Sequence, residues 1–301
     1  SENDMHEDTT FAEGIGPVPS LAGTSVLIFG GTSGIGLAAA VAAKGSGAAV
    51  TVVGRDRERA AHVAHTHGFA GSFACDINDP ETIRQGLLPI ERVDHLVLLA
   101  GGLTIGKVMD ADIGLLQRAY DERIWSVVHI LRALGERLAA DASITLVSGA
   151  LTHRPDGNGT AIVASACAAL EVLARGLALE LAPRRVNTLS PGPIDTPLIG
   201  KAMGDQREAY MRIVAESHPL HRWGSADEAA AAVLFLYVCR RRGERRLGQE
   251  AAVIFWGLLA GFAVYMLSLL VLYLFSYSEF EALRLASAQR YLSMYLTGML
   301  C

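Results

Sequence analysis

The segment that most constrains the fold is residues 25–36, with the sequence SVLIFGGTSGIG. Its apolar start, at 26–29, predicts a buried strand, and the alanine-rich run at 38–44 predicts a helix. A glycine-rich turn joins the two. A strand, a glycine turn and a helix in this order form the corner that holds phosphate groups in nucleotide-binding proteins.

Each glycine of this turn has a separate physical role. Gly30 permits a sharp turn, Gly34 permits the backbone to approach a pyrophosphate, and Gly36 permits the helix to pack against the strand. The anion then lies at the helix N-terminus, where unpaired N–H groups and the helix dipole favour negative charge. We therefore expect a dinucleotide site here, which also includes Ser33 and Ile35.

Apolar runs and helical patterns alternate along the next 200 or so residues. The predicted strands are 26–29, 48–53, 73–77, 95–100, 144–148 and 185–189. The predicted helices are 38–44, 56–67, 80–88, 115–139, 160–181, 205–216 and 225–238. Strands linked by helical crossovers form a parallel sheet covered on both faces, so the predicted fold class is α/β, with a Rossmann-type doubly wound parallel sheet over residues 21–239.

Composition limits the partners and the compartment. The net charge of -5 argues against a nucleic-acid partner. The four cysteines are widely spaced, without the pairs typical of a metal site, which indicates reduced thiols in the cytoplasm and no metal. Residues 1–20 are polar and acidic, which predicts a disordered lead-in.

Beyond residue 239 the composition changes abruptly. Residues 240–250 form an arginine-rich linker, and residues 251–278 contain no charged side chain. At about 1.5 Å per residue this run exceeds the ~30 Å hydrocarbon core of a bilayer, so a hydrophobic C-terminal helix that spans a membrane is the direct interpretation. The arginines would keep that end cytoplasmic. A buried core helix and a fused segment are the alternatives, and 279–301 is an amphipathic to hydrophobic tail.

Several short motifs carry a family resemblance. They are Gly30 to Gly36, Asp76, Ala100 with Gly101, and Pro191 with Gly192. In this order and spacing they resemble the short-chain dehydrogenase/reductase family over about residues 21–238. The resemblance implies a nicotinamide cofactor and hydride transfer to or from a carbonyl or alcohol of a small-molecule substrate.

The resemblance also implies roles for individual residues. Asp76 and Ile77 match the pair that contacts adenine, and Ala100 and Gly101 match the end of an Asn-Asn-Ala-Gly segment. Pro191, Gly192 and Thr196 match the segment that covers the nicotinamide. Phe29 stands where the family usually has Thr, and leucines replace both asparagines.

Cofactor choice depends on charge after the second strand, because an acid there pairs with a ribose diol and a base pairs with a 2′-phosphate. Arg55 occupies this place, so NADP(H) is favoured over NAD(H). A solvated loop arginine is the alternative.

The catalytic positions of the family are not matched. Val163 occupies the Tyr position and Cys167 the Lys position. The Ser position falls on Gly149, with Ser148 before it, and the Asn position falls near Ile124 or Trp125. Val163, Cys167 and Gly149 cannot supply the family's acid–base chemistry, so the catalytic residues stay unknown.

Two functions are compatible with this departure. The first is an oxidoreductase that uses other groups, with Ser148, His153, Arg154 or Ser165 as contributors. The second is a catalytically inactive dinucleotide-binding or scaffold module tethered to a membrane. The family's seventh strand, which makes its oligomer contacts, has no counterpart here, so a homo-oligomer stays an open alternative.

Overall fold

The computed structural model describes residues 20–99, 101–217 and 220–238, and every structural statement below concerns those residues. The predictions for the N-terminal lead-in, for the 240–250 linker, for a membrane helix at 251–278 and for the 279–301 tail lie outside the described residues.

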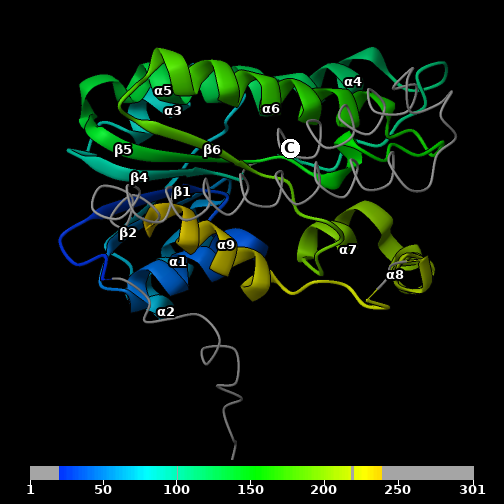
Figure 1. Ribbon diagram of the computed structural model, residues 1–301, viewed down its shortest axis with the longest axis horizontal. Helices are drawn as coiled ribbons and strands as arrows, with labels where there is room; N and C mark the ends of the chain where they lie inside the picture. The colour runs from blue at the N-terminus through cyan, green and yellow to red at the C-terminus, as the bar shows by residue number, and fades with distance from the viewer. Residues whose placement is uncertain (1–19, 100, 218–219, 239–301) are drawn as a thin grey trace, which may run out of the picture. The chain divides into compact units, whose positions relative to one another are not determined.

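A parallel sheet lies at the centre, with helices on both faces (Figure 1). Its strands are β1 (Ser25–Phe29), β2 (Ala49–Gly54), β3 (Gly71–Ala74), β4 (Val93–Leu98), β5 (Leu138–Val147) and β6 (Arg185–Leu189). They are arranged in the order β3-β2-β1-β4-β5-β6. The chain reverses its direction of winding between β1 and β4, so the predicted Rossmann-type doubly wound sheet is confirmed.

Helices cover both faces of this sheet. In chain order they are α1 (Gly34–Gly45), α2 (Arg57–His67), α3 (Pro80–Gly86), α4 (Ile113–Tyr120), α5 (Ser126–Leu134), α6 (Ala161–Glu180), α7 (Pro197–Met203), α8 (Arg207–Ser217) and α9 (Ala226–Val238). The helices α3, α5 and α6 lie on one face, and α1, α2 and α9 lie on the other (Figure 1).

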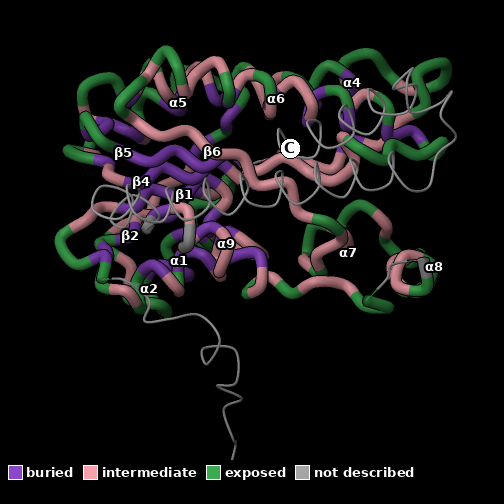
Figure 2. Tube along the Cα trace, in the orientation of Figure 1, coloured by how far each residue is buried: buried purple, intermediate pink, exposed green. Residues whose placement is uncertain are grey.

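Strand β1 shows how one short run of residues serves both faces. Leu27 and Phe29 belong to a core packed under α3, α5 and α6, whereas Val26 and Ile28 belong to a second core packed under α1 and α9. All four side chains are nearly inaccessible to solvent, and the central strands are coloured as buried in Figure 2. Because side chains of a strand alternate between faces, an unbroken apolar run is what a sheet covered twice requires.

Several predicted elements are wrong in their bounds. The strand predicted at 144–148 is β5, which begins six residues earlier, at Leu138. The helix predicted at 115–139 is divided into α4, a π-helical turn at Asp121–Trp125, and α5. Gly135, with φ of 53°, ends α5 and lets the chain enter β5 three residues later. The strand predicted at 73–77 ends at Ala74, so Asp76 lies in the turn that follows it.

One described helix, α6, is long and apolar enough to cross a membrane. Its buried residues include Val163, Cys167, Leu170 and Ala174, and Leu170 and Ala174 belong to the core on that face of the sheet. The core helix of a globular protein can be as long and as apolar as a membrane-spanning helix. Because α6 packs against the sheet through these buried residues, it is a core helix.

Candidate functional site

The glycine turn after β1 is closed so tightly that side chains cannot enter it. A Cβ atom on Gly36 would lie 2.2 Å from the carbonyl oxygen of Gly30. Gly30 itself has φ of 83°, and its N–H donates to the Val53 carbonyl at 2.9 Å. The turn follows β1 and is hydrogen-bonded to β2, and α1 begins at Gly34.

The first turn of α1 has the properties of an anion site. Ser33 precedes the helix without a side-chain hydrogen bond to it, and the first turn contains no acidic residue. Gly34 has φ of 53°, and a Cβ there would lie 3.2 Å from the Cβ of Thr196. Thr196 is thus brought beside the glycine turn although it lies far away in sequence. The free N–H groups, with Ile35 in the first turn, fit the diphosphate of a dinucleotide.

Arginines follow β2, and one of them, Arg59 of α2, reaches the same turn. Arg55 follows Gly54 and is exposed, and the Arg59 guanidinium donates from Nη2 to the carbonyl of Thr32 at 3.4 Å. The acid in this segment, Asp56, caps α2 by accepting the N–H of Arg59 at 3.0 Å. Arg55 and Asp56 are both exposed, and Asp56 is engaged in the helix cap through one oxygen, Oδ1.

The residues matched to the adenine contact lie after β3. Asp76 is exposed, and its carboxylate accepts the backbone N–H of Asn78 at 3.0 Å. The side chain of Ile77 is 7% exposed and packs into the core with Phe29 and Phe73. Phe29 and Phe73 meet edge to face, with ring centroids 6.1 Å apart, so Phe29 fills the place of the family's Thr with packing.

The segments matched to the nicotinamide end follow β4 and β6. Gly101 is described, whereas Ala100 lies outside the described residues. The carbonyl of Pro191 accepts the N–H of Ala150 at 3.0 Å, and Gly192 is exposed. The loops after β5 and β6 are therefore joined at the carboxyl edge of the sheet, which is the edge that carries ligands in open α/β sheets.

The positions of the family's Tyr and Lys are closed. Val163 is 0% exposed and Cys167 is 3% exposed on α6. The Ser148 hydroxyl turns toward α6, donating to Glu171 Oε1 at 3.0 Å and lying 3.2 Å from the Cys167 carbonyl oxygen. Gly149 has open space around it. The three sites that would hold acid–base groups therefore hold packing residues and open backbone.

Glu171 is a polar residue that the sequence patterns did not single out. Its Oε1 also accepts the hydroxyl of Ser190 at 2.6 Å. Burial would raise the pKa of this carboxyl, but the hydrogen bonds from Ser190 and Ser148 outweigh burial and hold the pKa below its usual value. The carboxylate thus ties the ends of β5 and β6 to α6. The only feature of the sequence that could have pointed to Glu171 is its spacing of four residues from Cys167, which puts both on one face of the helix.

The remaining predicted contributors are dispersed. His153 and Arg154 are exposed in the loop after β5. Ser165 accepts the hydroxyl of Tyr120 at 3.0 Å, which links α6 to α4. No group of three or more His, Cys, Asp or Glu among the residues described here is arranged to hold a metal ion.

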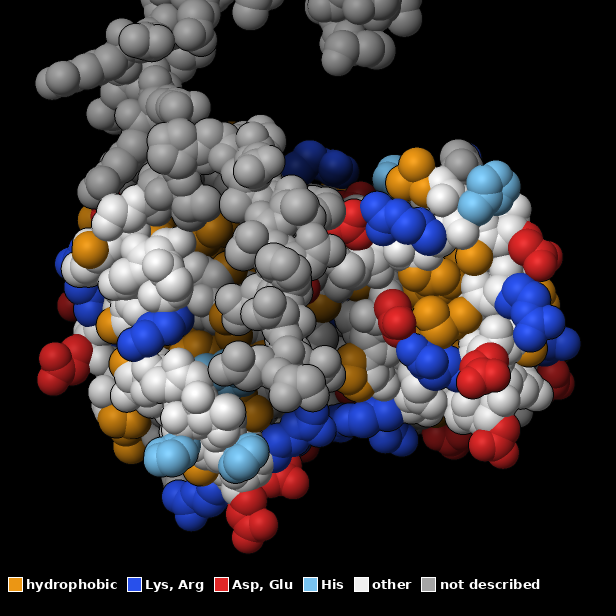
Figure 3. Space-filling view, turned by 90° about the horizontal axis from the view of Figure 1, so that it is seen from below, with side chains coloured by type: hydrophobic (Ala, Val, Ile, Leu, Met, Phe, Trp, Pro, Cys, Tyr) orange, Lys and Arg blue, Asp and Glu red, His pale blue; other side chains and the backbone are white. Residues whose placement is uncertain are grey.

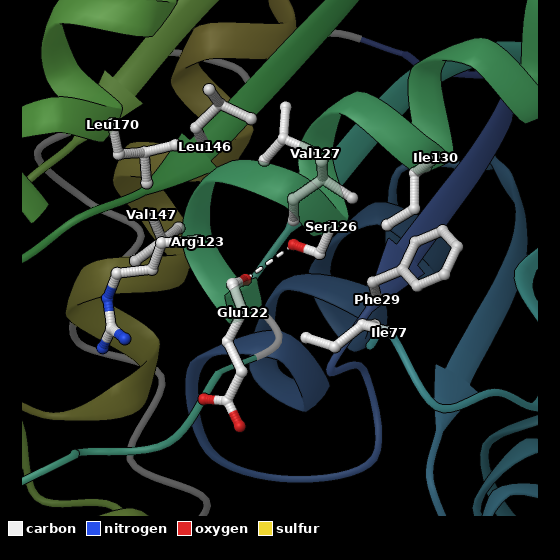
Figure 4. Close-up of a pocket in the computed structure, with 11 residues that line it drawn as sticks. Phe29, Ile77, Glu122, Arg123, Ser126, Val127, Ile130, Leu146, Val147 and Leu170 are labelled. Carbon is white, nitrogen blue, oxygen red and sulfur yellow. Dashed lines mark hydrogen bonds between the residues drawn. The ribbon is translucent and has the colours of Figure 1, made fainter. Parts of the chain in front are cut away.

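The Asn position of the family falls on the π-helical turn. Ile124 packs against the core and Trp125 is 55% exposed. The residues of this turn that contact the loop after β4 are Glu122 and Arg123. Glu122 accepts the N–H of Gly102 at 2.5 Å, and Arg123 donates to the Gly102 carbonyl at 2.8 Å. The Glu122 side chain extends away from Phe29, and the Arg123 side chain lies on the side of Val147 (Figure 4).

A small cavity lies under this turn. It has a volume of about 10 Å³, which is about the space of one water molecule and far below that of a substrate. Its lining residues are Phe29, Ile77, Leu98, Glu122, Arg123, Ser126, Val127, Ile130, Leu146, Val147 and Leu170. The cavity belongs to the core beneath the carboxyl edge of the sheet.

Hydrophobic side chains gather over the end of the molecule formed by α7 and α8, bordered by charged ones (Figure 3). Leu198 of α7 is 40% exposed and Ile213 of α8 is 65% exposed. An apolar surface therefore accompanies the segment that begins at Thr196.

Comparisons with known proteins agree with this architecture. A family model described as enoyl-(acyl carrier protein) reductase matches residues 30–243. The short-chain dehydrogenase/reductase ATR9 of Stachybotrys chlorohalonatus is 30% identical over 242 residues, which cover 73% of this chain and 92% of that protein.

Two solved structures are similar across nearly their whole length. A short-chain dehydrogenase from Burkholderia cenocepacia in complex with NADP is 27% identical, with a TM-score of 0.65, covering 72% of this chain and 91% of that one. L-Sorbose reductase from Gluconobacter frateurii, complexed with NADPH and L-sorbose, is 26% identical, with a TM-score of 0.64, covering 73% and 91%.

Proposed function

Because the chain belongs to the short-chain dehydrogenase/reductase family, whose members are oxidoreductases that act on alcohol and carbonyl groups, we propose that it is an NADP(H)-dependent oxidoreductase with an atypical active site. The observation that carries the proposal is the cradle at Gly30, Gly34 and Gly36, open to the N-terminus of α1. When bound, the nicotinamide would supply or accept the hydride, and the chain would contribute binding and orientation.

The residues at the end of β2 support NADP(H) over NAD(H). A carboxylate directly after β2 would accept the ribose hydroxyls of NAD(H), but Arg55 stands there, and the next residue, Asp56, uses Oδ1 to cap α2. Arg59 reaches the glycine turn and Arg55 is exposed directly after β2, and guanidinium groups suit the geometry of a phosphate. The Burkholderia and Gluconobacter structures contain NADP and NADPH, which supports the same cofactor.

Titration of the full chain with NADPH and with NADH, by calorimetry, tests this preference. We expect Arg55→Ala and Arg59→Ala each to weaken NADPH binding by about 10-fold to 100-fold, the range for one charge-assisted hydrogen bond, and to leave NADH binding unchanged. Arg57→Ala is the matched control, because Arg57 is an exposed arginine between them in sequence. Equal losses for both nucleotides, or tighter binding of NADH by the unaltered chain, would refute the preference.

A second candidate function is a dinucleotide-binding module without turnover. It is favoured by the burial of Val163 and Cys167 and by the Ser148 hydroxyl, which is turned toward Glu171. General acid–base catalysis contributes about 10²-fold to 10⁴-fold, so its loss slows a reaction without forbidding it. An assay of NADPH oxidation over a panel of aldehydes and ketones, on the sample that binds NADPH, separates the two: turnover supports the oxidoreductase, and tight binding without turnover supports the module.

A further inference from the structure

One glycine after β4 has both of its backbone polar groups held by adjacent charged side chains. The N–H of Gly102 donates to Glu122 Oε2 at 2.5 Å, and its carbonyl accepts from Arg123 Nη2 at 2.8 Å. Both bonds span about twenty residues of sequence, and both partners are partly buried. Bonds to charged groups are among the stronger hydrogen bonds in proteins. We call this pair the Glu122–Arg123 clamp.

The π-helical turn is what brings two consecutive side chains to one target. In a regular α-helix neighbouring residues point about 100° apart, so they seldom reach the same peptide unit. The wider turn at Asp121–Trp125 changes this spacing, and the hydroxyl of Ser126, the first residue of α5, donates to the Glu122 carbonyl at 2.6 Å. Single π-helical turns occur often at functional sites because they are retained despite poorer hydrogen bonding.

The same loop is fixed again four residues further on. The N–H of Gly106 donates to the carbonyl of Gly159 at 2.9 Å. Gly159 has φ of 88°, and a Cβ there would lie 2.8 Å from the Gly106 carbonyl carbon. The loop after β4 is thus held at Gly102 by the clamp and at Gly106 by the loop after β5. Between these points it borders the edge where a dinucleotide would lie.

We propose that Glu122 and Arg123 are positioning residues that hold the loop after β4 in the conformation that receives the nicotinamide half of the cofactor. This rests on the proposed function, because a fixed loop matters only if a dinucleotide binds beside it. A loop held in place before binding costs less entropy when the ligand arrives. The clamp lies in the same π-helical turn as Ile124 and Trp125, near which the family's Asn position falls, and it acts on the loop through Gly102.

Amide hydrogen exchange at Gly102, measured without any nucleotide, tests the clamp directly. Glu122→Ala removes the acceptor of that N–H, and we expect exchange at Gly102 to become about 10-fold to 100-fold faster, as for a lost hydrogen bond to a charged group. Glu122→Gln keeps an acceptor oxygen and is expected to restore most of the protection. Unchanged exchange at Gly102 in Glu122→Ala would overturn the clamp.

Measuring the affinity for NADPH tests whether the clamp positions the loop after β4 for the cofactor. If the competent loop becomes about tenfold rarer in Arg123→Met, the affinity for NADPH falls by the same factor. The control is Arg184→Met: Arg184 also donates to two backbone carbonyls, those of Leu138 and Ala139, both at 3.0 Å, but at the start of β5 on the opposite edge of the sheet. We expect this control to lower the melting temperature and to leave NADPH affinity unchanged.

Equal NADPH affinities in Arg123→Met and Arg184→Met would overturn the positioning role. Failure of the unaltered chain to bind NADPH or NADH would instead refute the proposed function. In that case the exchange rate at Gly102 still decides whether the clamp fixes the loop.

Discussion

Acidification is expected to destabilise this fold through a buried histidine, His95 in β4. The residue is 9% exposed, its Nδ1 lies 2.8 Å from the Ser143 hydroxyl, and its ring stacks on Tyr237 with centroids 4.7 Å apart. Burial lowers the pKa of His95 from 6.5 to about 4, more than nearby Asp94 raises it, and Arg185 lowers it further.

The sign and size of the effect follow from proton linkage. Between pH 6.5 and about 4 the unfolded chain binds a proton at His95 that the folded chain does not, so the free energy of unfolding falls as the pH falls. The full separation of these two pKa values corresponds to about 3 kcal/mol, at 1.36 kcal/mol per pKa unit. Above pH 6.5 the histidine is neutral in both states and contributes no pH dependence.

Urea unfolding of the unaltered chain and of His95→Gln, at a series of pH values from about 7 down to about 4, measures this contribution. We expect the difference between the two stability curves to change by about 3 kcal/mol across the window, because carboxylate titrations are common to both proteins. His62→Gln, on the exposed face of α2, is the control and should follow the unaltered chain. If His95→Gln loses as much stability on acidification as the unaltered chain, the reasoning fails.

Two further predictions concern the site. Gly36→Ala places a Cβ 2.2 Å from the Gly30 carbonyl oxygen, so it should cost about 1–3 kcal/mol in urea unfolding, as overpacking does, and weaken NADPH binding. Gly45→Ala in the same helix has open space, and it should leave binding intact; equal effects of both would contradict the close approach. Ser190→Ala removes one donor from Glu171 and should lower the free energy of unfolding by about 1 kcal/mol near pH 7. Because the pKa of that carboxyl is depressed in the fold, the difference should shrink as the pH falls through it, and a constant difference would refute the assignment.

The central part of the sheet was predictable because its strands are buried on both faces. Residues 26–29 were placed within one residue of β1, since an apolar run without alternation has few other interpretations. The prediction at 185–189 also matches β6, although this strand has a mixed sequence, RVNTL, and is only half-buried. The π-helical turn was not predictable, because one added residue in a helix barely disturbs apolar spacing over so long a run. Gly135 was the available stop signal within that run.

The candidate site also has one part that the sequence predicts and another that it does not. The glycine corner is largely local: the turn and the close approach of Gly36 to Gly30 lie within residues 30–36, and the sequence pattern predicted a turn followed by a helix there. The approach of Thr196 to Gly34 was not in the local pattern. Glu122, Arg123 and Glu171 act on backbone or hydroxyl groups about twenty residues away. Their partners are set by the packing of α5 and α6 on the sheet, which no local pattern records.

The burial of the family's catalytic positions leads to a last prediction, that restoring the missing side chains will not restore the chemistry. Val163 is 0% exposed, so Val163→Tyr adds a ring to filled space, and overpacking of this kind costs about 1–3 kcal/mol. Cys167→Lys buries an ammonium four residues before Glu171, on the same helix face, where the carboxylate would pair with it. We therefore expect the double variant to be less stable in urea and to oxidise NADPH no faster than the unaltered chain. Rapid turnover by a folded double variant would show that α6 can open these positions to substrate, and that the polar groups around Glu171 are not what holds them closed.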